Sequence, residues 1–163
     1  MESTFFKKIM VATDGSEEVR KAVDSAIEIA KLSDAKLYAV HVIALVSNSI
    51  IHIGNEEQIK AVKEQLTTEG KEATAYVDDA GKAANIDVES VILEGSPADE
   101  IVDFAERNDI DLIVIGTQGK SAIQRFLIGS VTENVVRHSA KIVLVVRGKN
   151  AKKRSLLNII EIL

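Results

Sequence analysis

The sequence predicts an α/β fold: one doubly wound domain with a five-stranded parallel sheet and helices on both faces. Short apolar segments alternate along the chain with longer segments whose apolar residues recur every three or four positions, as in amphipathic helices. Such alternation favours parallel strands joined by right-handed crossovers. Residues 112–115 and 142–146 are unbroken apolar runs, which is typical of strands that are covered on both faces.

The first two strands are expected at residues 9–12 and 36–43, with a helix between them. Ser16 is a candidate N-cap for this helix, which opens with two glutamates. The apolar residues of the helix recur at intervals of three and four, so they should form one buried face: Val19, Ala22, Val23, Ala26, Ile27 and Ala30.

Residues 44–55 form an irregular segment that is rich in isoleucine. We expect a loop packed over the domain, and the alternative is a lid or a surface for a partner. A long helix is expected at residues 56–84, with a bend or break at Gly70. Its buried face should consist of Ile59, Val62, Leu66, Ala73, Tyr76, Val77 and Ala80.

The second half of the chain continues the alternation. Pro97 suits the first turn of a helix, and Ser96 is its candidate cap. This helix should bury Ile101, Val102 and Ala105. The expected elements are strands at 87–93, 112–115 and 141–147, and helices at 98–107 and 131–139.

Composition limits the function. The 163 residues suit a single domain, expected at 1–148, and a net charge of −5 argues against a nucleic-acid-binding surface. The absence of cysteine excludes disulfides and thiolate metal sites. No apolar run reaches the roughly 20 residues of a membrane span, and the N-terminus has no signal-peptide pattern, so we expect a cytoplasmic protein.

The last residues, 149–163, form a separate extension that combines a basic run with an apolar segment. We expect a short helix that packs on its own domain or on a partner subunit. The alternative is an anchor at a membrane surface, with the basic run at the lipid headgroups. The anchor is not favoured, because the basic run has only four charges and the apolar segment allows a helix of only about two to three turns. The segment is also too short to span a membrane.

A glycine-rich segment follows the strand at 112–115, and a second glycine begins the next helix. Glycine allows the backbone to approach an anion closely and to adopt positive φ, and a helix N-terminus offers free N–H groups. A Walker A loop is excluded because Val114 stands where its first glycine should be. The candidate phosphate-binding residues are Gly116, Thr117, Gly119, Lys120, Ser121, Gly129, Ser130, Val131 and Thr132.

The pattern Gly-x-x-Gly, nine residues, Gly-Ser resembles the ATP-binding branch of the universal stress protein family. The resemblance extends from about Lys7 to Gly148 in the family's order. It includes KIMVATDGS at 8–16, HV at 41–42, EGSPA at 94–98, DLIVIG at 111–116 and VLVVR at 143–147. It implies strand order 3-2-1-4-5 with a nucleotide crevice between the first and fourth strands. The ligand would be ATP, or ADP or AMP, with Mg²⁺ or Mn²⁺ on its phosphates.

Four further residues belong to the expected nucleotide site: Ala12, Thr13, Asp14 and Val42. Asp14 would face the ribose hydroxyls or reach a phosphate-bound ion through water, and the alternative is a turn residue ahead of a glycine. By resemblance, the backbone at Val42 would bind the adenine edge. Ala12 stands where relatives often have proline. We expect no protein metal ligand, because the histidines share no close spacing, and His41 should be a core or crevice residue.

The resemblance also implies a homodimer through the last strand, Ile142 to Val146. Its apolar edge supports pairing on physical grounds as well, because an exposed edge otherwise invites aggregation. We expect a nucleotide-dependent regulatory switch in a stress response, and not an enzyme beyond slow ATP hydrolysis, since one lysine gives little support for phosphoryl transfer. The alternatives are a slow ATP hydrolase or nucleotidyl-transferring enzyme, and a nucleotide-free dimeric scaffold.

Overall fold

A computed structural model describes residues 5–44, 54–118 and 128–148, and every structural statement below concerns these residues. Strands and helices alternate from the first element to the last, as predicted. The elements are β1 (Lys8–Ala12), α1 (Glu17–Ser33), β2 (Lys36–Ile43), α3 (Glu56–Ala83), β3 (Val88–Glu94), α4 (Pro97–Arg107), β4 (Leu112–Gly116), α5 (Ser130–His138) and β5 (Ile142–Val146).

The five strands form one parallel sheet in the order β3-β2-β1-β4-β5, which confirms the predicted topology. β1 lies at the centre, where Met10 pairs with Tyr38 of β2 and with Ile113 of β4. The winding direction reverses between β1 and β4. In a doubly wound sheet, ligands bind beyond the carboxyl ends of the strands at this reversal.

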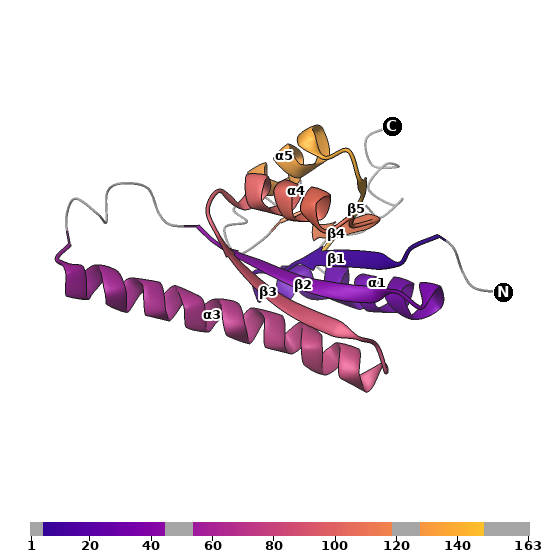
Figure 1. Cartoon of the computed structure of the whole chain (residues 1–163), viewed down its shortest axis with the longest axis horizontal. Coiled ribbons are helices and arrows are strands. Elements are labelled where there is room, and N and C mark those ends of the chain that lie inside the picture. Colours follow the sequence, from indigo (N-terminus) through magenta and orange to yellow (C-terminus); the bar gives the residue numbers. More distant parts are fainter. Residues whose placement is uncertain (1–4, 45–53, 119–127, 149–163) are drawn as a thin grey trace, which may run out of the picture.

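Helices cover both faces of the sheet, also as predicted. In Figure 1, α1 and α3 lie on one face of the sheet and α4 and α5 on the other. Successive residues of β1 point to opposite faces, so Ile9 and Val11 pack with α1 and α3, whereas Met10 packs with α4 and α5. The two aliphatic cores hold the carboxyl ends of β1, β2 and β4 in a fixed arrangement.

α1 buries the six apolar residues that the sequence predicts. The start of α1 differs from the prediction. Ser16 occupies the N-cap position, but its side chain makes no capping hydrogen bond. The Ser16 N–H instead donates to Oδ1 of Asp14 at 2.9 Å. The carboxylate therefore holds the turn that precedes α1, which is the turn role considered for Asp14.

α3 departs from the prediction in two ways. It runs without interruption through Gly70, which is buried against the ring of His41 on β2. Close packing therefore accounts for this glycine, and the predicted break is wrong. Much of the predicted apolar face is not buried either: Val62 and Tyr76 are 37% and 39% exposed. The buried positions are Gly70, Ala73, Thr74, Val77 and Gly81.

The first half of α3 extends past the end of the sheet (Figure 1). Lys63 forms an ion pair of 3.1 Å with Glu94, the last residue of β3, so the residues that precede Lys63 lie beyond the sheet. Asn55 and Gln58 form a reciprocal capping box at the free end of the helix. Local capping rather than burial therefore stabilises the beginning of α3.

The rest of the chain follows the prediction within one or two residues at element ends. α4 buries Ile101 and Ala105 as expected, and Ala98 and Phe104 in addition, whereas Val102 is only half-buried. Nearly all of the predicted loop at 44–55, and the whole extension at 149–163, lie outside the described residues. Among the helices of the described part, none is both long and apolar enough to cross a membrane.

Candidate functional site

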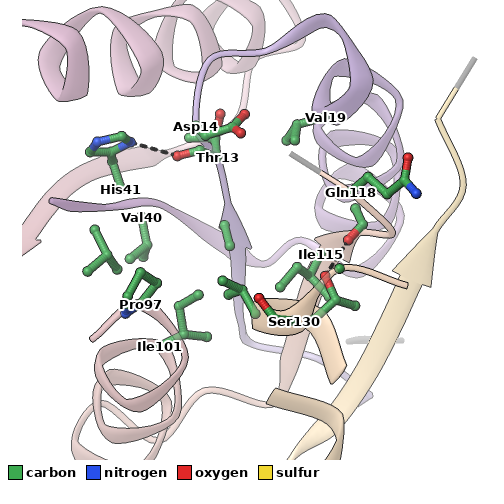
Figure 2. Close-up of a pocket in the computed structure, with 16 residues that line it drawn as sticks. Thr13, Asp14, Val19, Val40, His41, Pro97, Ile101, Ile115, Gln118 and Ser130 are labelled. Atoms are coloured by element: carbon green, nitrogen blue, oxygen red, sulfur yellow. Dashed lines mark hydrogen bonds between the residues drawn. The ribbon is translucent and has the colours of Figure 1, made fainter. Parts of the chain in front are cut away.

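A cavity of about 310 Å³ opens beyond the carboxyl ends of β1, β2 and β4, next to the first turns of α4 and α5. Figure 2 shows its lining side chains, with the turn after β1 facing the N-terminal ends of these two helices. Its volume is in the usual range for small-molecule sites. The cavity lies where the sheet topology places a ligand site, at the reversal between β1 and β4.

One part of the cavity wall is apolar. Val40 and Val42 come from the end of β2, Ile115 from β4, and Pro97 and Ile101 from the first turns of α4. These side chains present branched and ring carbon atoms and no charge. A flat, uncharged ring such as a nucleobase fits such a wall, because its faces need an apolar surface and only its edge needs hydrogen bonds.

Another part of the wall is the N-terminus of α5. Gly129 is the N-cap, and among the described residues no side chain makes a capping hydrogen bond there. The first N–H groups of a helix have no partner within the helix and carry the positive end of its dipole. Gly129 and Ser130 therefore form a surface that suits an anion such as a phosphate group.

Two hydrogen bonds fix this helix against the end of β4. The Gly129 N–H donates to the Thr117 carbonyl at 2.7 Å, and the Thr132 hydroxyl donates to the Gly116 carbonyl at 2.7 Å. Neither Gly116 nor Gly129 has positive φ, contrary to the expectation for these glycines. A methyl group at Gly129 would come no closer than 3.4 Å to other protein atoms. Glycine is a favoured N-cap, and it also leaves room for a ligand to approach the backbone closely.

The third part of the wall is the turn from Thr13 to Ser16. The Thr13 hydroxyl accepts a hydrogen bond from the Gly15 N–H at 3.2 Å, and Asp14 accepts one from Ser16. Gly15 has φ of 76°, a conformation that favours glycine. Nδ1 of His41 lies 2.9 Å from the Thr13 carbonyl oxygen (Figure 2). The turn thus presents Asp14 to the cavity with its backbone fixed.

The structure brings nine of the predicted site residues together around this cavity: Ala12, Thr13, Asp14, Val42, Gly116, Gly129, Ser130, Val131 and Thr132. Thr117 does not line the cavity. Its N–H donates to Val146 and its carbonyl accepts from Gly129, so it ties β4, β5 and α5 together. Gly119, Lys120 and Ser121 lie outside the described residues.

Charge is sparse in the described lining. Asp14 is its one carboxyl side chain, and no lysine or arginine contributes to it among the residues described. Within the same residues, no group of three or more histidine, cysteine, aspartate or glutamate side chains could hold a metal ion. In this part of the chain, backbone N–H groups are therefore the main attraction for an anion.

The sequence model of the universal stress protein family matches residues 5–147. The chain belongs to this family. Universal stress protein MJ0531 of Methanocaldococcus jannaschii is 39% identical over 142 residues, which are 87% of this chain and 82% of that protein. The structure of MJ0577, another universal stress protein of that organism, has a TM-score of 0.78 at 34% identity, and the match covers 91% of this chain and all (100%) of that one.

Two related universal stress protein structures contain adenine nucleotides. One, in complex with cAMP, has a TM-score of 0.63 and 32% identity, and covers 88% of this chain and 98% of its own. The other, from Archaeoglobus fulgidus in complex with dAMP, has a TM-score of 0.64 and 26% identity, and covers 88% of this chain and 100% of its own. Nucleotide binding therefore occurs in this family among proteins of the same fold.

Seven lining residues of this universal stress protein were not assigned to the site from its sequence: Val19, Val40, His41, Pro97, Ile101, Ile115 and Gln118. Most of them fit the ordinary pattern of buried strand and helix residues, so periodicity alone cannot separate them from the core. His41 was expected in the core or the crevice, and it does line the cavity. Pro97 had a usable signal, because the first turn of a helix after a parallel strand lies at the ligand-binding edge of the sheet.

Proposed function

We propose that this universal stress protein binds an adenine nucleotide and acts as a nucleotide-dependent regulatory switch in a stress response. The observation that carries the proposal is the pairing, in one cavity, of an apolar wall with the N-terminus of α5. The apolar wall suits the base, and the helix N-terminus suits the phosphates. The cAMP and dAMP complexes of related proteins support the same class of ligand.

The proposed ligand is ATP, or ADP or AMP, with Mg²⁺ or Mn²⁺ on its phosphates. Asp14 lines the cavity on the side of β1, across from Ser130. Direct contact between a carboxylate and a triphosphate is unfavourable, so Asp14 would bind the ribose hydroxyls or reach the ion through water. The proposed role is binding rather than catalysis, and the proposed location remains the cytoplasm.

The first test is the mass of any nucleotide released from the purified protein, followed by titration of Mg-ATP into the stripped protein. Recovered ATP or a saturable titration would support the proposal. Recovered ADP would support nucleotide binding and would indicate that the protein hydrolyses ATP. If no nucleotide is released and none binds on titration, the proposal is wrong.

The second test is Gly129→Ala. The added methyl group has room within the protein but would face the ligand at the N-terminus of α5. We expect the Kd for Mg-ATP to rise about tenfold, because a displaced phosphate loses hydrogen bonds to backbone N–H groups. The unfolding free energy should fall by no more than about 1 kcal/mol, the usual cost of alanine at an N-cap.

Val136→Ala is the matched control for Gly129→Ala. Val136 lies on the same helix, is 49% exposed and does not line the cavity. This variant should bind Mg-ATP as the wild type does. An unchanged Kd for Gly129→Ala, in a protein that binds ATP, would remove the N-terminus of α5 from the phosphate site.

A further inference from the structure

The ring of His41 makes a long-range contact to the turn after β1. Nδ1 of His41 lies 2.9 Å from the carbonyl oxygen of Thr13, 28 residues earlier in the chain. A carbonyl oxygen only accepts hydrogen bonds, so Nδ1 must carry the proton in this contact. The neutral ring is therefore the tautomer with hydrogen on Nδ1.

This contact is the second of two hydrogen bonds between Thr13 and β2. The regular pairing of β1 with β2 ends at Ala12 and Val40. One residue later, the Thr13 N–H still donates to the Val40 carbonyl at 2.9 Å, while the Thr13 carbonyl accepts from the ring of His41. A side chain of β2 thus takes the place of a backbone donor at the point where the chain leaves the sheet.

Two further hydrogen bonds within the turn are local. They join Thr13 to Gly15 and Asp14 to Ser16, each two residues apart. Local bonds define the shape of a turn, but they do not fix its direction relative to the sheet. Contacts with distant segments do that, and the Thr13 contacts to β2 are among them.

α3 packs against the ring of His41. A methyl group at Gly70 would lie 2.7 Å from Cδ2 of His41, so the ring packs directly on the helix backbone. Three residues later on the same helix face, Cβ of Ala73 would lie 3.2 Å from a methyl group at Gly15. One face of α3 therefore contacts both the ring of His41 and the turn that it holds.

We propose that His41 is a positioning residue for the nucleotide, and that Gly70 of α3 sets the position of its ring. Through the Thr13 carbonyl, His41 would hold the turn so that Asp14 faces the bound ribose or its ion. Without this bond, the ligand would have to order the turn when it binds, which weakens affinity. This inference rests on the proposed nucleotide site. It also implies that α3 contacts both the turn and the ring that holds it.

The test compares His41→Asn with His41→Leu. The two replacements are close in size and both remove the far side of the ring, but only asparagine can place an N–H donor near the position of Nδ1. We expect the Kd for Mg-ATP to rise less than about threefold for His41→Asn and about tenfold for His41→Leu, the usual range for one net hydrogen bond. Thermal unfolding should confirm that both variants are folded at the titration temperature.

The outcomes separate the two proposals. If the wild type does not bind Mg-ATP, the proposed function itself is wrong. If the wild type binds and the two variants have equal Kd values, the positioning role is overturned, because a purely structural loss would affect both alike. In the wild type, the long-range ¹H–¹⁵N spectrum of the neutral ring should show hydrogen on Nδ1. Hydrogen on Nε2 would also overturn the inference.

Gly70→Ala tests whether Gly70 sets the position of the His41 ring. The methyl group should displace the ring of His41 and raise the Kd for Mg-ATP in the wild-type background. In the His41→Leu background the tie to Thr13 is already lost, so the same change should have little further effect. Additive effects of the two substitutions would show that α3 does not act through His41.

Discussion

At the scale of single residues, Gly15 combines two constraints that no other residue type satisfies easily. Its φ of 76° is strained for residues with a side chain, and a methyl group there would lie 3.2 Å from Cβ of Ala73. Left-handed backbone costs a non-glycine residue about 1–2 kcal/mol. We expect Gly15→Ala to lower the unfolding free energy by about 2 kcal/mol, measured by urea denaturation, and to weaken Mg-ATP binding.

Ala73→Gly provides the control for Gly15→Ala. In the double variant the contact with α3 is relieved, so only the backbone strain of Gly15→Ala should remain beyond the cost of Ala73→Gly alone. A Gly15→Ala protein as stable as the wild type would show that the turn relaxes to another conformation without cost.

At the scale of elements, Lys36 links β2 to the edge strand β3. Its Nζ lies 2.6 Å from a carboxylate oxygen of Glu89. The hydrogen bond to Glu89 raises the pKa of Lys36 above its ordinary value of 10.5. A raised pKa means that the folded state holds the proton more tightly than the unfolded state. The stabilisation is therefore complete below pH 10.5 and is lost as the pH rises through the folded-state pKa.

Lys36→Met tests this linkage. The variant should be less stable than the wild type at pH 8, and the difference in urea midpoint should shrink as the pH is raised above 10.5. Lys31→Met on α1, at an exposed position, controls for the loss of a positive charge. A difference that stays constant with pH would mean that the ion pair contributes nothing to stability.

At the scale of the whole molecule, the two edges of the sheet differ. β3 carries exposed polar residues along its length, including Glu89 and Ser90, which discourage pairing with another chain. β5 reads Ile-Val-Leu-Val-Val, and Ile142 is 61% exposed. We expect a homodimer in which β5 pairs with its copy.

Val143→Pro tests the expected dimer. The carbonyl of Val146 faces β4, where it accepts from Thr117, so the backbone groups of Val143 face the open edge. Proline there removes an outward N–H and leaves the hydrogen bonds to β4 in place. Sedimentation should show a dimer for the wild type and a monomer for the variant. A monomeric wild type at about 100 μM would contradict this interface, since specific interfaces usually bind far more tightly.

The family resemblance implied the sheet order, and short motifs together with the ends of the strands located most of the site. β1 ends at Ala12 and β4 ends at Gly116, so in a parallel sheet the residues that follow them lie at the same edge. Packing between distant elements was harder to predict from the sequence. Gly70 suggests a break by intrinsic propensity, but the ring of His41 makes glycine necessary in a continuous helix. Likewise, the periodicity of apolar residues could not show that the first half of α3 extends past the end of the sheet.

The overhang of α3 has a consequence for local unfolding. Its 28 residues span about 42 Å, whereas the eight residues of β2 span about 26 Å. The part beyond the sheet is stabilised by its capping box and by side-chain pairs along the helix, each of which contributes only tenths of a kcal/mol to about 1 kcal/mol. We therefore expect the helix to unfold locally from Asn55 towards Gly70, and amide protection in hydrogen exchange to rise where the backbone packs on the ring of His41.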